Sequence, residues 1–236
     1  MNYNSLYNTN ILLCCGEEIM KQMSLRCDNG DITLPYYIYR PETNEKLPLI
    51  VFLHGAGERG NGTTELERVK LHGLPKYLSE GKEYPAIILA PQCPEGAVWN
   101  NLIFALKELI DSVIKNYNVD VNKVSITGLS MGGFGTWEMG ISYPELFSAM
   151  APICGGGMSW SCNRLKDIPI WAFHGDMDNV VPLKNSVEMV DAVNKAGGSA
   201  KLTILHNVGH NSWEEAYTSS NVVEWLISKS RTTRTV

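Results

Sequence analysis

A regular alternation of short apolar runs with helical patterns constrains the fold more than any other feature of this chain. From residue 49 onward the runs are four or five residues long, the length of buried strands, and they cover residues 49–53, 86–90, 124–127, 149–153, 170–173 and 202–205. Three other segments repeat apolar residues at helical spacing: Leu102, Leu106, Leu109, Ile110 and Val113; Leu183, Val187, Val190 and Val193; and Val222, Val223, Leu226 and Ile227. This alternation predicts an α/β fold in which a mostly parallel sheet carries helices on both faces.

The N-terminal part of the chain carries a different signal. Asn29-Gly30 separates two strand-like runs, residues 23–27 and 32–39, and this dipeptide favours the tight turn of an antiparallel hairpin. Residues 1–19 show neither helical nor strand periodicity, so we expect a disordered leader there, one compact domain over residues 20–230 and a short tail over 231–236. About 15 residues separate the strand at 149–153 from the next one, which is too few for a cap domain.

Charge and hydropathy exclude several classes of partner. The 20 Lys and Arg residues are scattered and the formal net charge is −5, so no basic surface is expected to bind nucleic acid. No apolar stretch approaches the ~20 residues of a membrane-spanning helix, and the apolar run at 11–15 lacks the basic residues that precede a signal sequence. We therefore expect a cytoplasmic protein that acts on a small molecule and binds neither nucleic acid nor membrane. The oligomeric state is left open.

The six cysteines have no metal-binding or scaffold pattern. They occur at positions 14, 15, 27, 93, 154 and 162 without a Cys-x-x-Cys pair. Buried free thiols are therefore expected, with a disulfide between Cys154 and Cys162 as the alternative in an oxidising compartment. His206 and His210 have the spacing of a helical metal site, but Gly209 places them in a turn. No metal and no cofactor are expected.

One motif carries nucleophilic chemistry. Residues 128–132, Gly-Leu-Ser-Met-Gly, match G-x-S-x-G and lie between the strand-like run at 124–127 and a helix-like segment at 133–141. The sharp strand-to-helix turn of this motif lifts the serine hydroxyl clear of the backbone, and the flanking glycines avoid clashes within the turn. Because the pattern alone also arises by chance, it is the strand–turn–helix setting that favours Ser130 as a nucleophile.

A serine nucleophile needs a base and an acid that orients the base, and candidates for both follow Ser130 in the chain. The acid candidates, Asp176 and Asp178, come after the strand at 170–173, and the base candidate, His210, comes after the strand at 202–205. Because parallel strands end at the same edge of a sheet, these loops are expected to meet there. Asp176 directly follows a glycine, a pattern that is typical of a turn.

Four segments taken together resemble the α/β-hydrolase superfamily. They are LHGAGERG at 53–60, GLSMGG at 128–133, HGDMDNVVP at 174–182 and GHNSW at 209–213. More narrowly, they are similar to the lidless group of carboxylesterases, dienelactone hydrolases and "predicted peptidases", which many feruloyl and acetyl esterases resemble. The resemblance covers about residues 20–230. It implies a single-domain α/β-hydrolase fold with no cap domain.

The resemblance also implies roles for individual residues. Ser130 is the expected nucleophile, His210 the general base, and Asp178, rather than Asp176, the acid that orients the base. The backbone amides of Ala56 and Met131 are the expected oxyanion-hole donors. The expected activity is that of a serine carboxylesterase, which hydrolyses short-acyl or aryl carboxylic esters through an acyl-enzyme.

Two other functions are compatible with the same residues. Serine peptidases similar to prolyl oligopeptidase share this order of serine, acid and histidine, but they usually carry a gating domain for which this chain has no room. A non-catalytic binding protein with the hydrolase fold normally lacks one of the three residues, whereas all three are present here.

Residues that neighbour the motifs have structural as well as functional interpretations. Glu58 and Arg59 either contact the substrate or form a solvated ion pair. Trp99 and Trp213 either line a substrate pocket or belong to the core. Structural positions are expected for the others: hydrogen bonds within loops for His54 and His174, the surface for His72, and the first turn of the closing helix for Glu214 and Glu215.

Overall fold

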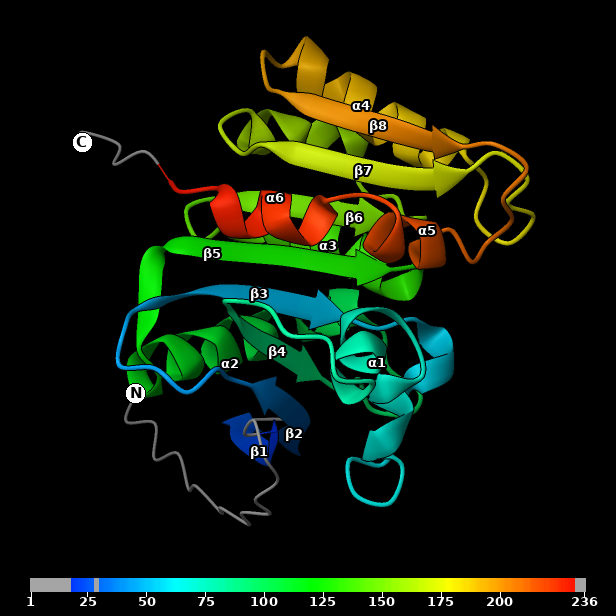
Figure 1. Ribbon diagram of the computed structural model, residues 1–236. Coiled ribbons are helices and arrows are strands. Elements are labelled where there is room, and N and C mark those ends of the chain that lie inside the picture. The colour runs from blue at the N-terminus through cyan, green and yellow to red at the C-terminus, as the bar shows by residue number, and fades with distance from the viewer. Residues whose placement is uncertain (1–17, 28–29, 232–236) are drawn as a thin grey trace.

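A computed structural model describes residues 18–27 and 30–231 of the chain (Figure 1). Within these residues one eight-stranded sheet has the order β1-β2-β4-β3-β5-β6-β7-β8. Its strands are β1 (Glu18–Cys27), β2 (Gly30–Tyr39), β3 (Leu47–Leu53), β4 (Ile87–Pro91), β5 (Val119–Leu129), β6 (Ala149–Ile153), β7 (Ile170–Gly175) and β8 (Ala200–Leu205). Neighbouring strands run parallel except in the antiparallel pairs β1–β2 and β2–β4, which confirms the predicted sheet.

The antiparallel pairing of β1 with β2 confirms the predicted N-terminal hairpin. β1 and β2 pair from Glu18↔Tyr39 to Cys27↔Gly30, so both strands are longer than the runs at 23–27 and 32–39. β1 begins two residues before position 20, where the sequence places the start of the folded domain. The rest of the leader predicted over 1–19, and the tail predicted over 231–236 except its first residue, lie outside the described residues.

Helices cover both faces of the sheet, as Figure 1 shows. One face carries α2 (Ile103–Asn116), α3 (Met131–Ser142) and α4 (Lys184–Lys195), and the other carries α1 (Gly73–Ser79), α5 (Trp213–Thr218) and α6 (Val222–Ser228). Alternate residues of a strand point to opposite faces. In β3 this sends Val51 into the first core and Ile50 and Phe52 into the second, and all three are fully buried. The sheet is therefore apolar on both sides.

Short 3₁₀ helices occupy the connections between these elements. They are η1 (Ala56–Glu58), η2 (Leu66–Lys70), η3 (Trp99–Leu102) and η4 (Ser159–Leu165). η4 lies in the segment after β6, where a cap would enter, but it packs on α4, and Cys162 Sγ lies 3.8 Å from the Met189 carbonyl oxygen. Residues 154–169 thus form loops and one short helix, in agreement with the predicted lack of a cap domain.

The C-terminal helix differs from its prediction because it is divided. Glu214 and Glu215 lie in the first turn of α5, a separate helix that precedes α6. The break falls at residues 219–221, where Ser220 Oγ accepts a hydrogen bond from the Val222 amide at the start of α6. Within the described part of the chain, each helix is too short or too polar to cross a lipid bilayer.

The described cysteine side chains are buried free thiols. Cys93, Cys154 and Cys162 are unpaired, so the disulfide considered between Cys154 and Cys162 is not formed. Burial raises the pKa of Cys162 to about 11 and those of Cys93 and Cys154 to about 12. The other three cysteine side chains lie outside the described part of the structure.

Candidate active site

Ser130 lies in a strained turn between β5 and α3. Its backbone has φ 53° and ψ −117°, a conformation that residues other than glycine rarely adopt. Glycine is required on both sides: a Cβ on Gly132 would lie 1.9 Å from the carbonyl oxygen of Leu53, and one on Gly128 would lie 2.5 Å from that of Gly132. The G-x-S-x-G pattern therefore permits close packing of this turn against the end of β3.

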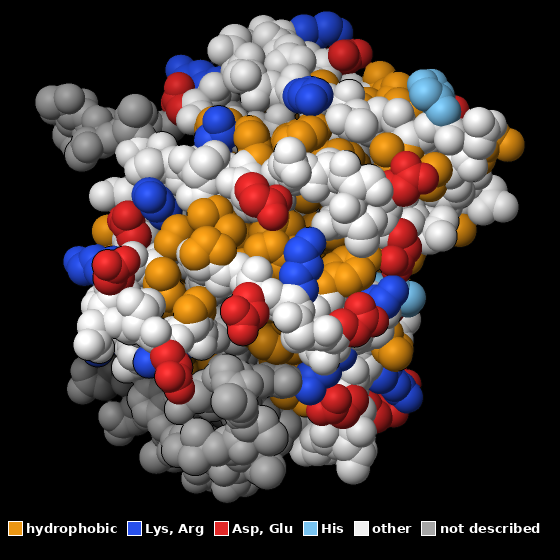
Figure 2. Space-filling view, in the orientation of Figure 1, with side chains coloured by type: hydrophobic (Ala, Val, Ile, Leu, Met, Phe, Trp, Pro, Cys, Tyr) orange, Lys and Arg blue, Asp and Glu red, His pale blue; other side chains and the backbone are white. Residues whose placement is uncertain are grey.

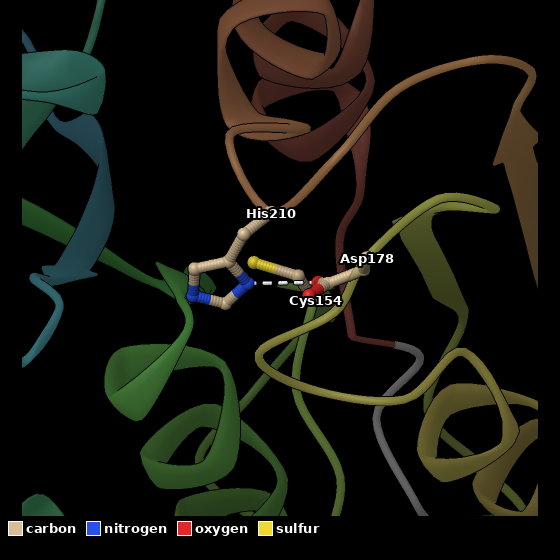
Figure 3. A group of neighbouring side chains, drawn as sticks. All are labelled: Cys154, Asp178 and His210. Atoms are coloured by element: carbon tan, nitrogen blue, oxygen red, sulfur yellow. Dashed lines mark hydrogen bonds and ion pairs between the residues drawn. The ribbon is translucent and has the colours of Figure 1, made fainter.

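Three side chains from three loops form a hydrogen-bonded row at the carboxyl ends of the strands. His210 Nε2 lies 2.9 Å from Ser130 Oγ. His210 Nδ1 lies 2.7 Å from Asp178 Oδ2, the contact drawn in Figure 3. Because an ionised carboxylate can only accept, Nδ1 carries the proton and Nε2 is free to accept one from the serine. The structure thus brings Ser130, His210 and Asp178 together.

The carboxylate of Asp178 is buried but well supplied with donors. Its Oδ1 accepts hydrogen bonds from the amides of Val180 and Val181, each at 2.9 Å. Burial by itself would raise the pKa of this carboxyl, but the hydrogen bonds from His210, Val181 and Val180 hold it below its ordinary value. Asp178 therefore stays ionised while its side chain is shielded from water.

Asp176 belongs to a different set of contacts. Its Oδ1 accepts the Asn207 amide at 2.8 Å, and its Oδ2 lies 2.9 Å from His206 Nδ1. The side chain of His206 is 78% exposed, so this pair is on the surface. Hydrogen bonding to His206 lowers the pKa of Asp176. Asp178, and not Asp176, faces His210.

The loop after β3 holds the Ala56 amide in a fixed orientation. His54 is buried, and its Nε2 accepts the Cys93 amide at 2.9 Å, so its Nδ1 carries the proton and donates to the Gly55 carbonyl at 2.6 Å. In a trans peptide the carbonyl and the next N–H point in opposite directions, so this bond turns the Ala56 N–H away from His54. Burial lowers the pKa of His54 to about 4, which keeps the ring neutral.

Arg59 and Trp99 hold the same loop through hydrogen bonds to its backbone carbonyls. Arg59 donates from Nε to the Ala56 carbonyl at 2.9 Å and from Nη1 to the Ala97 carbonyl at 3.2 Å, so it does not pair with Glu58. Trp99 is fully buried and donates from Nε1 to the His54 carbonyl at 2.9 Å. Trp99 is therefore a core residue and not a pocket wall.

Glu58 is buried instead of solvated. Only 5% of the residue is exposed, and its carboxylate oxygens lie 3.8 Å from His54 Nδ1 and 3.8 Å from His72 Nε2. Oε2 has no hydrogen-bond partner. Burial raises the pKa of Glu58, and the nearby His72 offsets only part of this shift.

We expect Glu58→Gln to raise the melting temperature at roughly pH 7, because the amide removes a buried charge that lacks a full set of hydrogen bonds. Folding raises the pKa of this carboxyl above its ordinary value of 4.5. The wild-type protein therefore loses folding stability as the pH rises through the pKa of the folded state. The gain in melting temperature should disappear at about pH 4, where this carboxyl is protonated in both the folded and the unfolded protein. Thermal melts across pH test this, with the exposed Glu188→Gln as control. A lower melting temperature for Glu58→Gln at neutral pH would contradict it.

His72 was expected on the surface, and its side chain is 40% exposed, but it also lies among residues of the site. Its Nε2 is 3.8 Å from Glu58, its Nδ1 is 3.9 Å from Glu214, and its ring centroid is 5.5 Å from that of Trp213. The Trp213 ring in turn meets the His210 ring edge-on at 5.4 Å. Trp213 therefore borders His210. No sequence pattern connects position 72 with 58 or 213, so only the tertiary structure places His72 here.

Cys154, Asp178 and His210 are close enough to share a metal ion, since one ligand atom from each lies within 4.8 Å of the others (Figure 3). Their chemistry does not favour this. The pKa of the buried Cys154 thiol is raised to about 12, which disfavours the thiolate that binds metals. Asp178 Oδ2 is already bonded to His210. The donor set therefore fits a hydrogen-bonded row better than a metal site.

The row lies at the edge of the sheet where the parallel strands end. The arrowheads of β3, β5, β6 and β7 point to this edge in Figure 1, and histidine side chains appear at the same edge of the surface in Figure 2. Residues 37–221, a range that contains Ser130, Asp178 and His210, match the protein family described as phospholipase/carboxylesterase. The chain belongs to the phospholipase/carboxylesterase family. The match confirms the resemblance to α/β-hydrolases.

Two solved structures have a fold similar to that of this family member. The chain is 35% identical to a thermostable esterase, with a TM-score of 0.77 over 90% of this chain and 63% of that one. Est1E from Butyrivibrio proteoclasticus is 17% identical, with a TM-score of 0.63 over 88% of this chain and 99% of that one. At such low identity the second likeness concerns the fold alone.

Sequence relatives of this family member include acetylxylan esterases. The chain is 28% identical over 142 residues to an acetylxylan esterase from Coprinopsis cinerea, which covers 54% of this chain and 36% of that protein. It is 28% identical over 144 residues to acetylxylan esterase A from Emericella nidulans, covering 54% and 45%. The chain spans less than half the length of each of these relatives.

Proposed function

We propose that this chain is a serine carboxylesterase in which Ser130 is the nucleophile, His210 the general base and Asp178 the acid that orients the base. The observation that supports this most is the row from Ser130 Oγ through His210 to Asp178, with contacts of 2.9 and 2.7 Å. The strained backbone of Ser130 supports it too, because strain of this kind persists where the surrounding structure enforces it and clusters at active sites.

In the first half-reaction His210 Nε2 takes the hydroxyl proton as Ser130 Oγ attacks the carbonyl carbon of the ester. The carbonyl oxygen becomes an oxyanion, which accepts hydrogen bonds from the amides of Ala56 and Met131. His210 then gives its proton to the leaving alcohol as the ester C–O bond breaks. An acyl group remains bonded to Ser130.

In the second half-reaction His210 takes a proton from water, and the water oxygen attacks the acyl carbon. The same two amides stabilise the second oxyanion. The bond to Ser130 Oγ breaks, His210 returns the proton to that oxygen, and the carboxylic acid leaves. Each cycle consumes one ester and one water and restores both side chains.

The two proposed oxyanion donors are held in place before substrate binds. Ala56 opens η1 and Met131 opens α3, and the N–H of a first helical residue has no acceptor within its own helix. His54 holds the peptide before Ala56, and Arg59 holds the one after it. Donors that need no reorganisation during the reaction contribute most to stabilising an oxyanion.

We further propose short acyl groups as substrates, joined to alcohols that extend into solvent. η4 packs on the body of the protein, so the segment after β6 does not enclose the site with the apolar wall that a long acyl chain needs. Two of the relatives are named as acetylxylan esterases, and the acetyl group is a short acyl group. The substrate in this proposal is a small ester molecule.

A series of p-nitrophenyl esters tests the acyl preference. We expect the highest kcat/KM for acyl chains of about two to four carbons, because each methylene that stays solvated gains none of the ~0.8 kcal/mol that burial provides. Acetate, butyrate, octanoate and palmitate are compared at matched soluble concentrations, with aminoacyl p-nitroanilides alongside. A steady rise in kcat/KM toward palmitate would contradict the open site. Faster cleavage of the anilides would favour a peptidase.

A further inference from the structure

The Asp178 carboxylate lies between two histidines, and only one of them belongs to the proposed mechanism. The second is His174, at the carboxyl end of β7, whose Nε2 lies 3.2 Å from the same Oδ2 atom that His210 contacts. The His174 side chain is completely buried, as is that of Asp178, whereas one fifth of the His210 side chain is exposed. His174 therefore touches the acid where solvent does not.

Hydrogen bonds determine which nitrogen of His174 carries a proton. Nε2 lies 2.9 Å from the Val181 carbonyl oxygen, which can only accept, so Nε2 carries a proton that it donates to this oxygen, and Asp178 Oδ2 lies 3.2 Å from the same nitrogen. Nδ1 lies 2.8 Å from Ser186 Oγ, and this hydroxyl also bonds to the Gly155 carbonyl at 3.0 Å. Ser186 belongs to α4. The contacts at both ring nitrogens therefore hold the His174 ring in one rotation.

Both carboxylate oxygens of Asp178 lie close to donor groups. Oδ1 accepts from the amides of Val180 and Val181, and Oδ2 faces His210 Nδ1 and His174 Nε2. A carboxylate offers about four lone-pair sites, and the hydrogen bonds from Val180, Val181 and His210 use three of them. The arrangement around Asp178 is then a Ser–His pair on each side, Ser130–His210 in the site and Ser186–His174 in the interior.

We propose that His174, held by Ser186, is a positioning residue that fixes the Asp178 carboxylate so that Oδ2 faces His210. The Val180 and Val181 amides hold one oxygen, and His174 stops the other from swinging away from the base. His174 also donates a hydrogen bond to the Val181 carbonyl, and this bond holds the turn that supplies those two amides. This inference rests on the proposed function, since it assigns a role within that mechanism.

Two conservative variants test the contacts of the two His174 ring nitrogens separately. An asparagine amide has the reach of Nδ1, and a glutamine amide has the reach of Nε2. His174→Asn therefore keeps a partner for Ser186 and loses the N–H group beside Asp178, whereas His174→Gln keeps an N–H group there. We expect His174→Asn to lower kcat for p-nitrophenyl acetate by about 10- to 100-fold with KM within about twofold, and His174→Gln to restore kcat to within about threefold of wild type.

Nuclear magnetic resonance gives a readout that needs no activity. In protein labelled with ¹⁵N at histidine, the low-field N–H proton of His210 Nδ1, assigned with His210→Gln, should move in His174→Asn and stay near its wild-type position in His174→Gln. Unchanged kcat and an unchanged resonance in His174→Asn would overturn the proposal. An equal loss of kcat in both variants, with lowered melting temperatures, would overturn it too, because it would reduce His174 to a packing residue.

The same experiments separate this inference from the proposed function. If the wild-type protein hydrolyses no ester, the proposed function fails, and the resonance of His210 still reports whether His174 positions Asp178. If the wild type is an active esterase and His174→Asn is equally active, only the role of His174 fails.

Discussion

Ser130→Ala is expected to lower kcat for ester hydrolysis by roughly four orders of magnitude or more and to leave the melting temperature close to that of the wild type. In the proposed mechanism the Ser130 hydroxyl forms the acyl-enzyme, and its partner in the structure is His210 Nε2. Alanine keeps the backbone turn and removes one partly exposed hydroxyl. Any remaining rate would come from the Ala56 and Met131 amides acting on bound ester.

The matched control for this variant is Ser142→Ala, at the other end of α3. Ser130 precedes the first residue of α3 and Ser142 is its last residue, and both are partly exposed. Ser142 Oγ contacts Glu138 at 3.4 Å and has no contact with the row. Ser142→Ala should therefore keep full activity. Retention of more than a few percent of the wild-type rate in Ser130→Ala would rule out the proposed nucleophile.

Asp178→Asn is expected to lower kcat by about 10⁴-fold, because an amide can donate to His210 Nδ1 and so favour the tautomer in which Nε2 cannot take the serine proton. It would also leave a buried position without the charge that stabilises protonated His210. Kinetics at saturating p-nitrophenyl acetate measure the loss, and near-wild-type unfolding would show that it does not come from misfolding.

Asp176→Asn provides the comparison, two residues away on the same loop. Its carboxylate contacts His206 and Asn207 instead of His210, so we expect a change in kcat of less than about tenfold. If Asp176→Asn were the more damaging variant, the acid would have to be reassigned.

The sheet could be predicted where burial leaves a clear pattern. β6 occupies residues 149–153, the same as its apolar run, because a central parallel strand is covered on both faces and each of its residues is buried. β5 instead begins at Val119, five residues before its apolar run at 124–127, because residues 120–123 are partly or fully exposed and three of the four carry polar side chains. A strand that extends beyond the helices that cover it loses the pattern that marks it.

The residues of the site could be predicted only in part. Ser130, Asp178 and His210 were expected to meet because each follows a parallel strand, and strand ends share an edge of the sheet. No comparable rule predicts the contacts between segments that are distant in the sequence. Trp99 opens η3 and reaches the His54 carbonyl in the interior, and His72 meets Trp213 across the site. These pairs share no spacing or motif in the sequence.

His174 marks a different limit of sequence reasoning. Hydrogen bonding within its loop was expected for this histidine, and the contact with the Val181 carbonyl is of that kind. Its contact with Asp178 depends on the path of the loop over four residues, which brings Oδ2 of the acid back to the ring at 3.2 Å. A pattern of residue types does not specify that path.

The most direct test of the account is to trap the acyl-enzyme. Wild-type protein mixed with p-nitrophenyl acetate and quenched in acid within milliseconds can be digested and its peptides weighed. The account predicts a mass gain of one acetyl group on the peptide that carries Ser130, together with a burst of p-nitrophenol that is absent from Ser130→Ala. An acetyl group found on another residue, or a burst that persists in Ser130→Ala, would contradict it.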